Sequence, residues 1–226
     1  MKRRGTVDFV FMLPCLLAFS LVILVPFGLG IYYALTDWNG VRADIQFIGL
    51  ANFRSMFTEP QFIFSFLITL QYTAINVVFV NAVGFALALM VTSQLKLRNF
   101  YRAGFFVPNL IGGLVLGYIW QFMFNNVLVD FGRSMSIAGL SSSMLASKDS
   151  VIWAMSFVNT WQYAGYIMMI YVAAIQSISG SLMEAASVDG AGYFRRVRSI
   201  LVPIVANAFT ITLFLTLTTS FKQYDL

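Results

Sequence analysis

Five apolar runs follow one another along the chain, separated by short segments that hold the charged residues. The runs extend over residues 9–36, 61–95, 103–129, 151–176 and 202–221, and none contains an Asp, Glu, Lys, Arg or His. Each reaches the roughly 20 residues that a helix needs to cross the hydrocarbon core of a bilayer. Strand-period alternation is absent from them, which disfavours a β-barrel. The pattern predicts an all-α polytopic membrane protein, with a single transmembrane domain over residues 1–226 and five spans.

Composition agrees with this prediction, because 59% of the residues are apolar and only 10% are charged. The basic residues also predict an orientation. With the N-terminus in the cytoplasm, nine of the 14 Lys and Arg residues lie inside, as the positive-inside rule requires. They form three juxtamembrane clusters: Lys2, Arg3 and Arg4; Lys96, Arg98 and Arg102; and Arg195, Arg196 and Arg198. Attraction to anionic lipid headgroups explains these clusters better than nucleic-acid binding does.

The residue types that the chain lacks narrow its function. Ion-coupled carriers usually bury ionisable groups near the membrane midplane, and the apolar runs here hold none. The sequence has no phosphate-binding loop of the G-x-x-x-x-G-K-[ST] type, no histidine and a single cysteine, Cys15. We therefore expect no catalytic centre, no metal and no bound cofactor, and we expect any ATP to be bound by a partner subunit.

The segment 177–201, between the fourth and fifth runs, resembles a short soluble helix followed by a turn. An acidic residue near the start of a helix is favoured by the helix dipole, and Asp189-Gly190 permits a sharp turn. Proline is well accommodated in the first turn of the next helix. The residues of interest in and after this segment are Glu184, Ala185, Ala186, Asp189, Gly190, Ala191 and Pro203.

The spacing of these seven residues resembles the EAA loop of permease subunits of binding-protein-dependent ABC importers, in particular the carbohydrate-uptake (maltose-type) branch. Val197 and Val202 depart from the family pattern, where an aromatic residue and Leu are usual. Further segments look like family positions in family order: 35–38, 49–53, 105–108, 119–120 and 165–166.

The resemblance implies a type I ABC importer helical bundle in a bacterial or archaeal plasma (inner) membrane. In that family a sixth core span follows the fifth, so we expect that span to be missing from the C-terminal end of this chain. The implied partners are a second permease, identical or different, two copies of a cytoplasmic ABC ATPase that receive the EAA loop, and an extracytoplasmic solute-binding protein.

Polar residues form stripes in two of the predicted spans. Asn159, Gln162, Tyr163 and Tyr166 share one helical face, and Thr212, Thr216 and Ser220 recur at every fourth position. Amide, hydroxyl and aromatic groups suit a neutral sugar or polyol. By the resemblance, Asn159, Gln162, Tyr163, Tyr166, Thr216 and Ser220 are candidate substrate-binding residues.

Two alternatives remain open at this point. The polar residues can instead form hydrogen bonds between helices, and the substrate site can lie on the second permease. A different class of function, an ATP-independent carrier or channel for a small neutral polar solute, is the second hypothesis for the whole chain.

Overall fold

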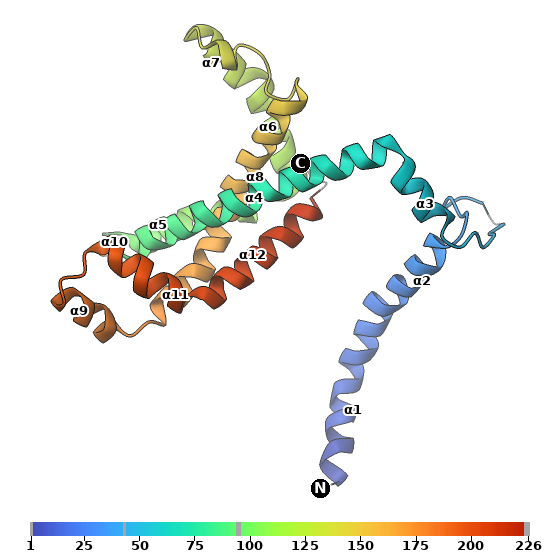
Figure 1. Ribbon diagram of the computed structural model, residues 1–226, viewed down its shortest axis with the longest axis horizontal. Coiled ribbons are helices and arrows are strands. Elements are labelled where there is room, and N and C mark those ends of the chain that lie inside the picture. The colour runs from blue at the N-terminus through green and yellow to red at the C-terminus, as the bar shows by residue number, and fades with distance from the viewer. Residues whose placement is uncertain (1, 43, 94–95, 224–226) are drawn as a thin grey trace. The chain divides into compact units, whose positions relative to one another are not determined.

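The computed structural model describes residues 2–42, 44–93 and 96–223, and helices dominate it (Figure 1). The described residues contain no β-strand, only an isolated antiparallel bridge between Thr36 and Phe47. The chain divides into two compact units, Met1–Leu67 and Ile68–Leu226. Helix α4 begins in the first unit and continues through the second.

The first unit starts with one long apolar helical stretch. It comprises α1 (Lys2–Phe19), the π-helical turn η1 (Ser20–Leu24) and α2 (Val25–Ala34). A loop follows, then α3 (Ala51–Thr58) and the beginning of α4 (Pro60–Thr92). The side-chain amide of Asn52 closes the loop by donating to the carbonyls of Ala34 and Thr36, at 3.0 and 2.8 Å.

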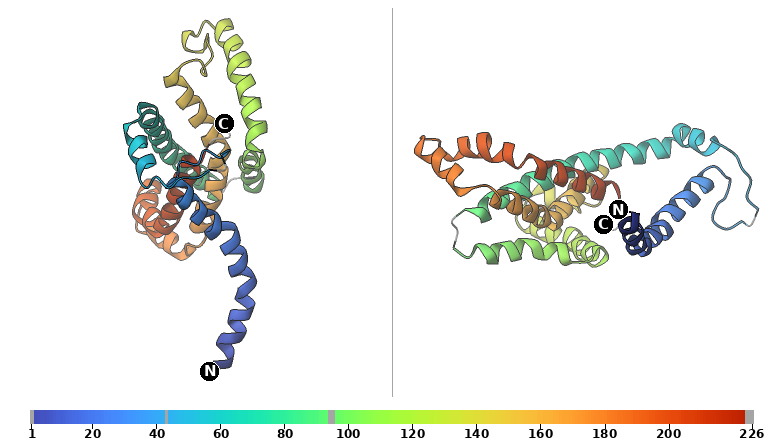
Figure 2. Two further views of the ribbon diagram at one scale, coloured as in Figure 1. Left: turned by 90° about the vertical axis from the view of Figure 1, so that its right-hand side faces the viewer. Right: turned by 90° about the horizontal axis from the view of Figure 1, so that it is seen from below.

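The second unit contains the remaining helices, which Figure 2 shows from two further directions. Their bounds are α5 (Arg98–Phe106), η2 (Val107–Leu110), α6 (Gly113–Phe122), η3 (Met123–Val127), α7 (Leu128–Ser134), η4 (Ala138–Leu140), α8 (Lys148–Gln176), α9 (Gly180–Val188), α10 (Tyr193–Arg196), η5 (Val197–Leu201), α11 (Val202–Ile204) and α12 (Ala206–Phe221).

Helix α8 is central to the second unit. A buried apolar cluster joins it to α4 and to the segment that leads into α12, through residues such as Val80, Met168 and Val205. A second cluster joins α8 to α6 and η3 through Leu116, Phe124 and Val158. On a further side α5 packs so closely that a Cβ on Gly165 would lie 1.8 Å from the carbonyl oxygen of Phe105.

Three helical stretches in the described part of the chain are apolar and long enough to cross a membrane: Asp8–Ala34, Pro60–Thr92 and Gly113–Ser134. Two more reach the same standard when a bent helix pair counts as one span. These pairs are Lys148–Gln176 with Gly180–Val188, bent by 74°, and Tyr193–Ile204 with Ala206–Phe221, bent by 72°.

Two of the predicted runs contain breaks in the helix. Within 103–129, Ile111 and Gly112 have extended backbone between η2 and α6, where Pro108 and a glycine pair weaken the helix. Within 202–221, the 72° bend separates Ile204 from Ala206. Pro203 therefore lies in the helical segment before the bend, and the straight helix begins after it.

Candidate functional site

A cavity of about 120 Å³ lies where α4, α8 and α12 meet. Four of the six candidate substrate-binding residues line it: Asn159, Tyr163 and Tyr166 from α8, and Thr216 from α12. Thr219 of α12 and apolar side chains complete the lining. The helical spacing of the two polar stripes explains this convergence, because each stripe places its residues on one face of its helix.

The other two candidates lie outside the lining of this cavity. The side-chain amide of Gln162 donates to the carbonyl of Ile111 at 3.1 Å, which satisfies backbone at the break between η2 and α6. Ser220 is 2% exposed, and its hydroxyl has no hydrogen-bond partner among the described residues. The structure thus brings together three of the four residues of the α8 stripe and one of the three residues of the α12 stripe, and gives Gln162 a contact elsewhere.

Asparagines of α4 lie behind the cavity, and the sequence interpretation did not single them out. Asn76 accepts a hydrogen bond from the side-chain amide of Asn159 at 2.7 Å. Asn81 donates to the hydroxyl of Thr216 at 3.1 Å and accepts from the hydroxyl of Tyr171 at 3.0 Å. The two asparagines inside the mostly apolar run 61–95 were the available signal, since such groups in a span require partners.

Two larger cavities also open on α8. One of about 380 Å³ lies against α6, and one of about 400 Å³ lies against α4, with Phe79, Trp153 and Phe157 among its lining residues. Aromatic and aliphatic side chains dominate both linings. Neither contains any of the candidate substrate-binding residues.

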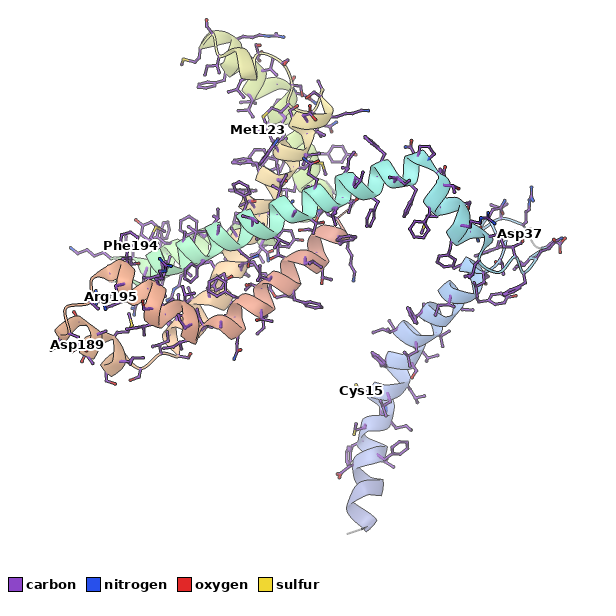
Figure 3. All side chains as sticks on the ribbon, viewed as in Figure 1. Cys15, Asp37, Met123, Asp189, Phe194 and Arg195 are labelled. Carbon is purple, nitrogen blue, oxygen red and sulfur yellow. The ribbon has the colours of Figure 1, made fainter. Side chains whose placement is uncertain are left out.

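The segment 177–201 folds as two short helices joined by a tight turn. Helix α9 ends in a Schellman motif, in which the amide of Ala191 donates to the carbonyl of Ala186 at 2.9 Å and the amide of Gly190 donates to that of Ser187 at 3.2 Å. Gly190 has a φ of +76°, a left-handed conformation that suits glycine. The Asp189-Gly190 turn thus has a defined geometry (Figure 3).

The side chains of this loop differ in exposure. Glu184, Ala185 and Asp189 are exposed, whereas Ala186 is 8% exposed and packs within the chain itself. Two large apolar side chains are almost fully exposed beside them, Val188 at 88% and Phe194 at 85%. The sequence interpretation passed over both.

Comparison with known proteins assigns the class. No protein-family model matches the chain. The chain is 40% identical over 223 residues to a probable starch degradation products transport system permease protein, AmyD, of Thermoanaerobacterium thermosulfurigenes, covering 99% of this chain and 76% of the relative. It is 31% identical to the diacetylchitobiose uptake system permease protein NgcF of Streptomyces coelicolor, covering 91% of this chain and 62% of the relative.

A solved structure has the same fold. It is a bacterial ABC transporter involved in the import of the acidic polysaccharide alginate, with a TM-score of 0.81, 22% identity, and coverage of 97% of this chain and 75% of that one. The fold is therefore that of an ABC importer permease. The chain belongs to the family of permease subunits of binding-protein-dependent sugar ABC importers, and the predicted family and fold class are confirmed.

Proposed function

We propose that this chain forms part of the translocation path of an ATP-driven sugar importer and couples that path to a cytoplasmic ATPase. In this proposal it performs no covalent chemistry and binds no cofactor. ATP is bound by two copies of a cytoplasmic ATPase, a second permease encloses the substrate, and an extracytoplasmic binding protein delivers it. Kinship with a named starch-product permease over 99% of the chain is the observation that carries the proposal.

The coupling role belongs to the loop 177–201. Its support is a pre-formed helix–turn–helix whose exposed face includes Glu184, Ala185, Val188 and Phe194. The occupant of this face is the ATPase, because a permease of this family without a nucleotide site of its own needs contact with the subunit that binds ATP. The basic cluster Arg195, Arg196 and Arg198 favours a cytoplasmic position for the loop, and hence a cytoplasmic N-terminus.

The substrate role belongs to the cavity between α4, α8 and α12. Its volume of about 120 Å³ is below the roughly 300 Å³ at which ordinary ligand pockets begin. It therefore accommodates one edge of a sugar, and the second permease supplies the rest of the enclosure. The aromatic rings of Tyr163 and Tyr166 can stack on a sugar ring while hydroxyl and amide groups bind its hydroxyls.

The coupling role is tested by a matched pair of glycine variants. Gly190 has a φ of +76°, whereas Gly192 has a φ of −62°, and a Cβ at either position meets nothing within 4 Å. Valine is a severe outlier at positive φ and is well tolerated in extended backbone, so Gly190→Val distorts the turn and Gly192→Val leaves it intact.

The tagged full-length chain, as native protein and as each variant, is purified in mild detergent from its native membrane with its associated subunits. We expect an ATPase to accompany the native chain and Gly192→Val, and its yield to fall roughly tenfold with Gly190→Val, since the left-handed conformation costs a side-chain-bearing residue about 1–2 kcal/mol. Equal recovery of the ATPase with both variants would exclude a role for this turn in docking. A native chain purified without any ATPase would overturn the proposed function.

A further inference from the structure

Backbone carbonyls of α4 determine which end of the Asn76 and Asn81 side-chain amides donates a hydrogen bond and which end accepts one. The side-chain nitrogen of Asn76 donates to the carbonyl of Tyr72 at 2.8 Å and to the hydroxyl of Ser156 at 3.2 Å. A carbonyl can only accept, so the atom of the Asn76 amide that lies beside the carbonyl of Tyr72 is the nitrogen, and the oxygen is the atom beside Asn159. That oxygen accepts from the side-chain nitrogen of Asn159 at 2.7 Å.

The side-chain oxygen of Asn159, an acceptor, is therefore left without a partner among the described residues. This Oδ1 atom is buried, which is costly unless a ligand supplies a donor. Asn159 lines the cavity and is only 2% exposed, so a donor that approaches this oxygen must be small. A hydroxyl has the required size.

Thr216 is oriented in the same way by the second asparagine of α4. The side-chain nitrogen of Asn81 donates to the carbonyl of Val77 at 2.8 Å and to the hydroxyl oxygen of Thr216 at 3.1 Å. The Thr216 hydroxyl gives its own hydrogen to the carbonyl of Thr212 at 2.7 Å. Thr216 thus retains only an acceptor lone pair for the cavity.

The hydroxyl of Thr219, like that of Thr216, gives its hydrogen to backbone and keeps only acceptor lone pairs for the cavity. Thr219 donates its hydrogen to backbone carbonyls of α12, at 2.9 Å to Leu215 and 3.1 Å to Thr216. Tyr163 and Tyr166 are the lining residues whose hydroxyls can donate or accept. Among the residues that the structure describes, the lining contains no Lys, Arg or His.

We infer that Asn76 and Asn81 are positioning residues that make this cavity an acceptor-rich site, which selects a neutral, hydroxyl-bearing sugar edge and rejects a carboxylate or phosphate there. This inference rests on the proposed function and adds the polarity of the substrate group. An ionised acidic group offers only acceptors. Apart from the hydroxyls of Tyr163 and Tyr166, it would face the oxygens of Asn159, Thr216 and Thr219, with no cation among the described lining residues to compensate.

The experiment uses the complete importer, purified with its partner subunits and reconstituted in proteoliposomes with its binding protein. The probes are radiolabelled maltotriose, its monodeoxyfluoro derivatives and a glucuronate-containing trisaccharide. Fluorine replaces a hydroxyl at nearly the same size and cannot donate a hydrogen bond. In the native importer we expect at least one monofluoro derivative to be taken up about tenfold less well than maltotriose, because a buried acceptor loses its donor. The acidic trisaccharide should be taken up least.

Asn76→Leu tests the positioning role. Without Asn76 the amide of Asn159 is free to turn its nitrogen toward the cavity, so the uptake ratio of maltotriose to the disfavoured fluoro derivative should fall toward one. The matched control is Ser156→Ala, which removes another partner of Asn76 and leaves the bond to Tyr72 that defines the polarity. The control should keep the native ratio. A purely structural role for Asn76 would lower uptake of both sugars in proportion and leave the ratio unchanged.

The failures of the two proposals are distinguishable. ATP-dependent uptake of maltotriose with equal uptake of every fluoro derivative and of the acidic trisaccharide would overturn the polarity inference alone. Absence of ATP-dependent uptake of any neutral sugar would overturn the proposed function. Should Asn76→Leu fail to assemble, equal uptake of every fluoro derivative by the native importer would still overturn the polarity inference.

Discussion

Replacing Gly165 by alanine tests the close contact that holds α5 against α8. A Cβ at this position would lie 1.8 Å from the carbonyl oxygen of Phe105 and 2.5 Å from its carbonyl carbon. Ordinary van der Waals contact requires the two helices to separate by about 1.5 Å. Backbone atoms form the opposing surface, so no side chain can rotate away to make room.

Overpacking of this kind costs about 1–3 kcal/mol and occasionally more. For a chain of 226 residues this corresponds to a loss of roughly 2–12 °C in Tm. Tyr166, a cavity residue, adjoins Gly165 in α8, so transport should decline together with stability.

The matched control is Gly104→Ala in α5, where a Cβ meets nothing within 4 Å. Alanine favours a helix over glycine by about 1 kcal/mol, so this variant should be as stable as the native chain or slightly more stable. The assay heats samples of the detergent-purified chain and measures, by size-exclusion chromatography with fluorescence detection, the fraction that remains folded at each temperature. Equal Tm values for the Gly165→Ala and native proteins would refute the close approach of α5 to α8.

Substitutions at three further sites test hydrogen bonds; those at Tyr171 and Ser147 are read by the same thermal assay, and that at Asn52 is read by proteolysis. Tyr171→Phe should lower stability by about 1 kcal/mol because the amide oxygen of Asn81 loses its donor; an unchanged Tm would contradict this. Ser147→Ala should cost about 1 kcal/mol by removing the N-cap of α8, where the serine hydroxyl accepts from the amide of Ser150, and Ser147→Asp, which can cap in the same way, should retain native stability. Asn52→Leu removes two bonds to carbonyls of the first unit and should increase proteolysis of the 35–50 loop. Proteolysis at the native rate would contradict the role of Asn52 in holding this loop.

The fold class and the family could be read from the sequence because their signals are local. Charge-free runs of sufficient length indicate membrane helices, and the ordered residues around Glu184 and Gly190 indicate the permease family. The periodicity of Asn159, Tyr163 and Tyr166 likewise predicted that these residues share one face of a helix, and four of the candidate residues line one cavity.

Other features depend on contacts between distant segments, which periodicity does not reveal. Gln162 shares the helical face of Asn159 but bonds to the carbonyl of Ile111 at the break between η2 and α6. The hydropathy pattern showed one continuous run across that break, so it did not indicate this partner. Asn76 lies 83 positions before Asn159, and only the packing of α4 on α8 brings them together. Ala186 is 8% exposed whereas Ala185 beside it is exposed, a difference that residue spacing alone does not specify.

ATP-dependent sugar uptake by the complete importer is the most direct test of the account. Proteoliposomes containing the native chain with its co-purified subunits would be loaded with ATP, with a non-hydrolysable analogue or with no nucleotide, and uptake of radiolabelled maltotriose would be measured in the presence of the binding protein. We predict that the sugar accumulates only when ATP is present, at least tenfold above the level with the analogue or without nucleotide. Gly190→Val should abolish this accumulation, and Gly192→Val should not. Equal uptake with and without ATP would contradict the account and would identify the chain as part of an ATP-independent carrier or channel.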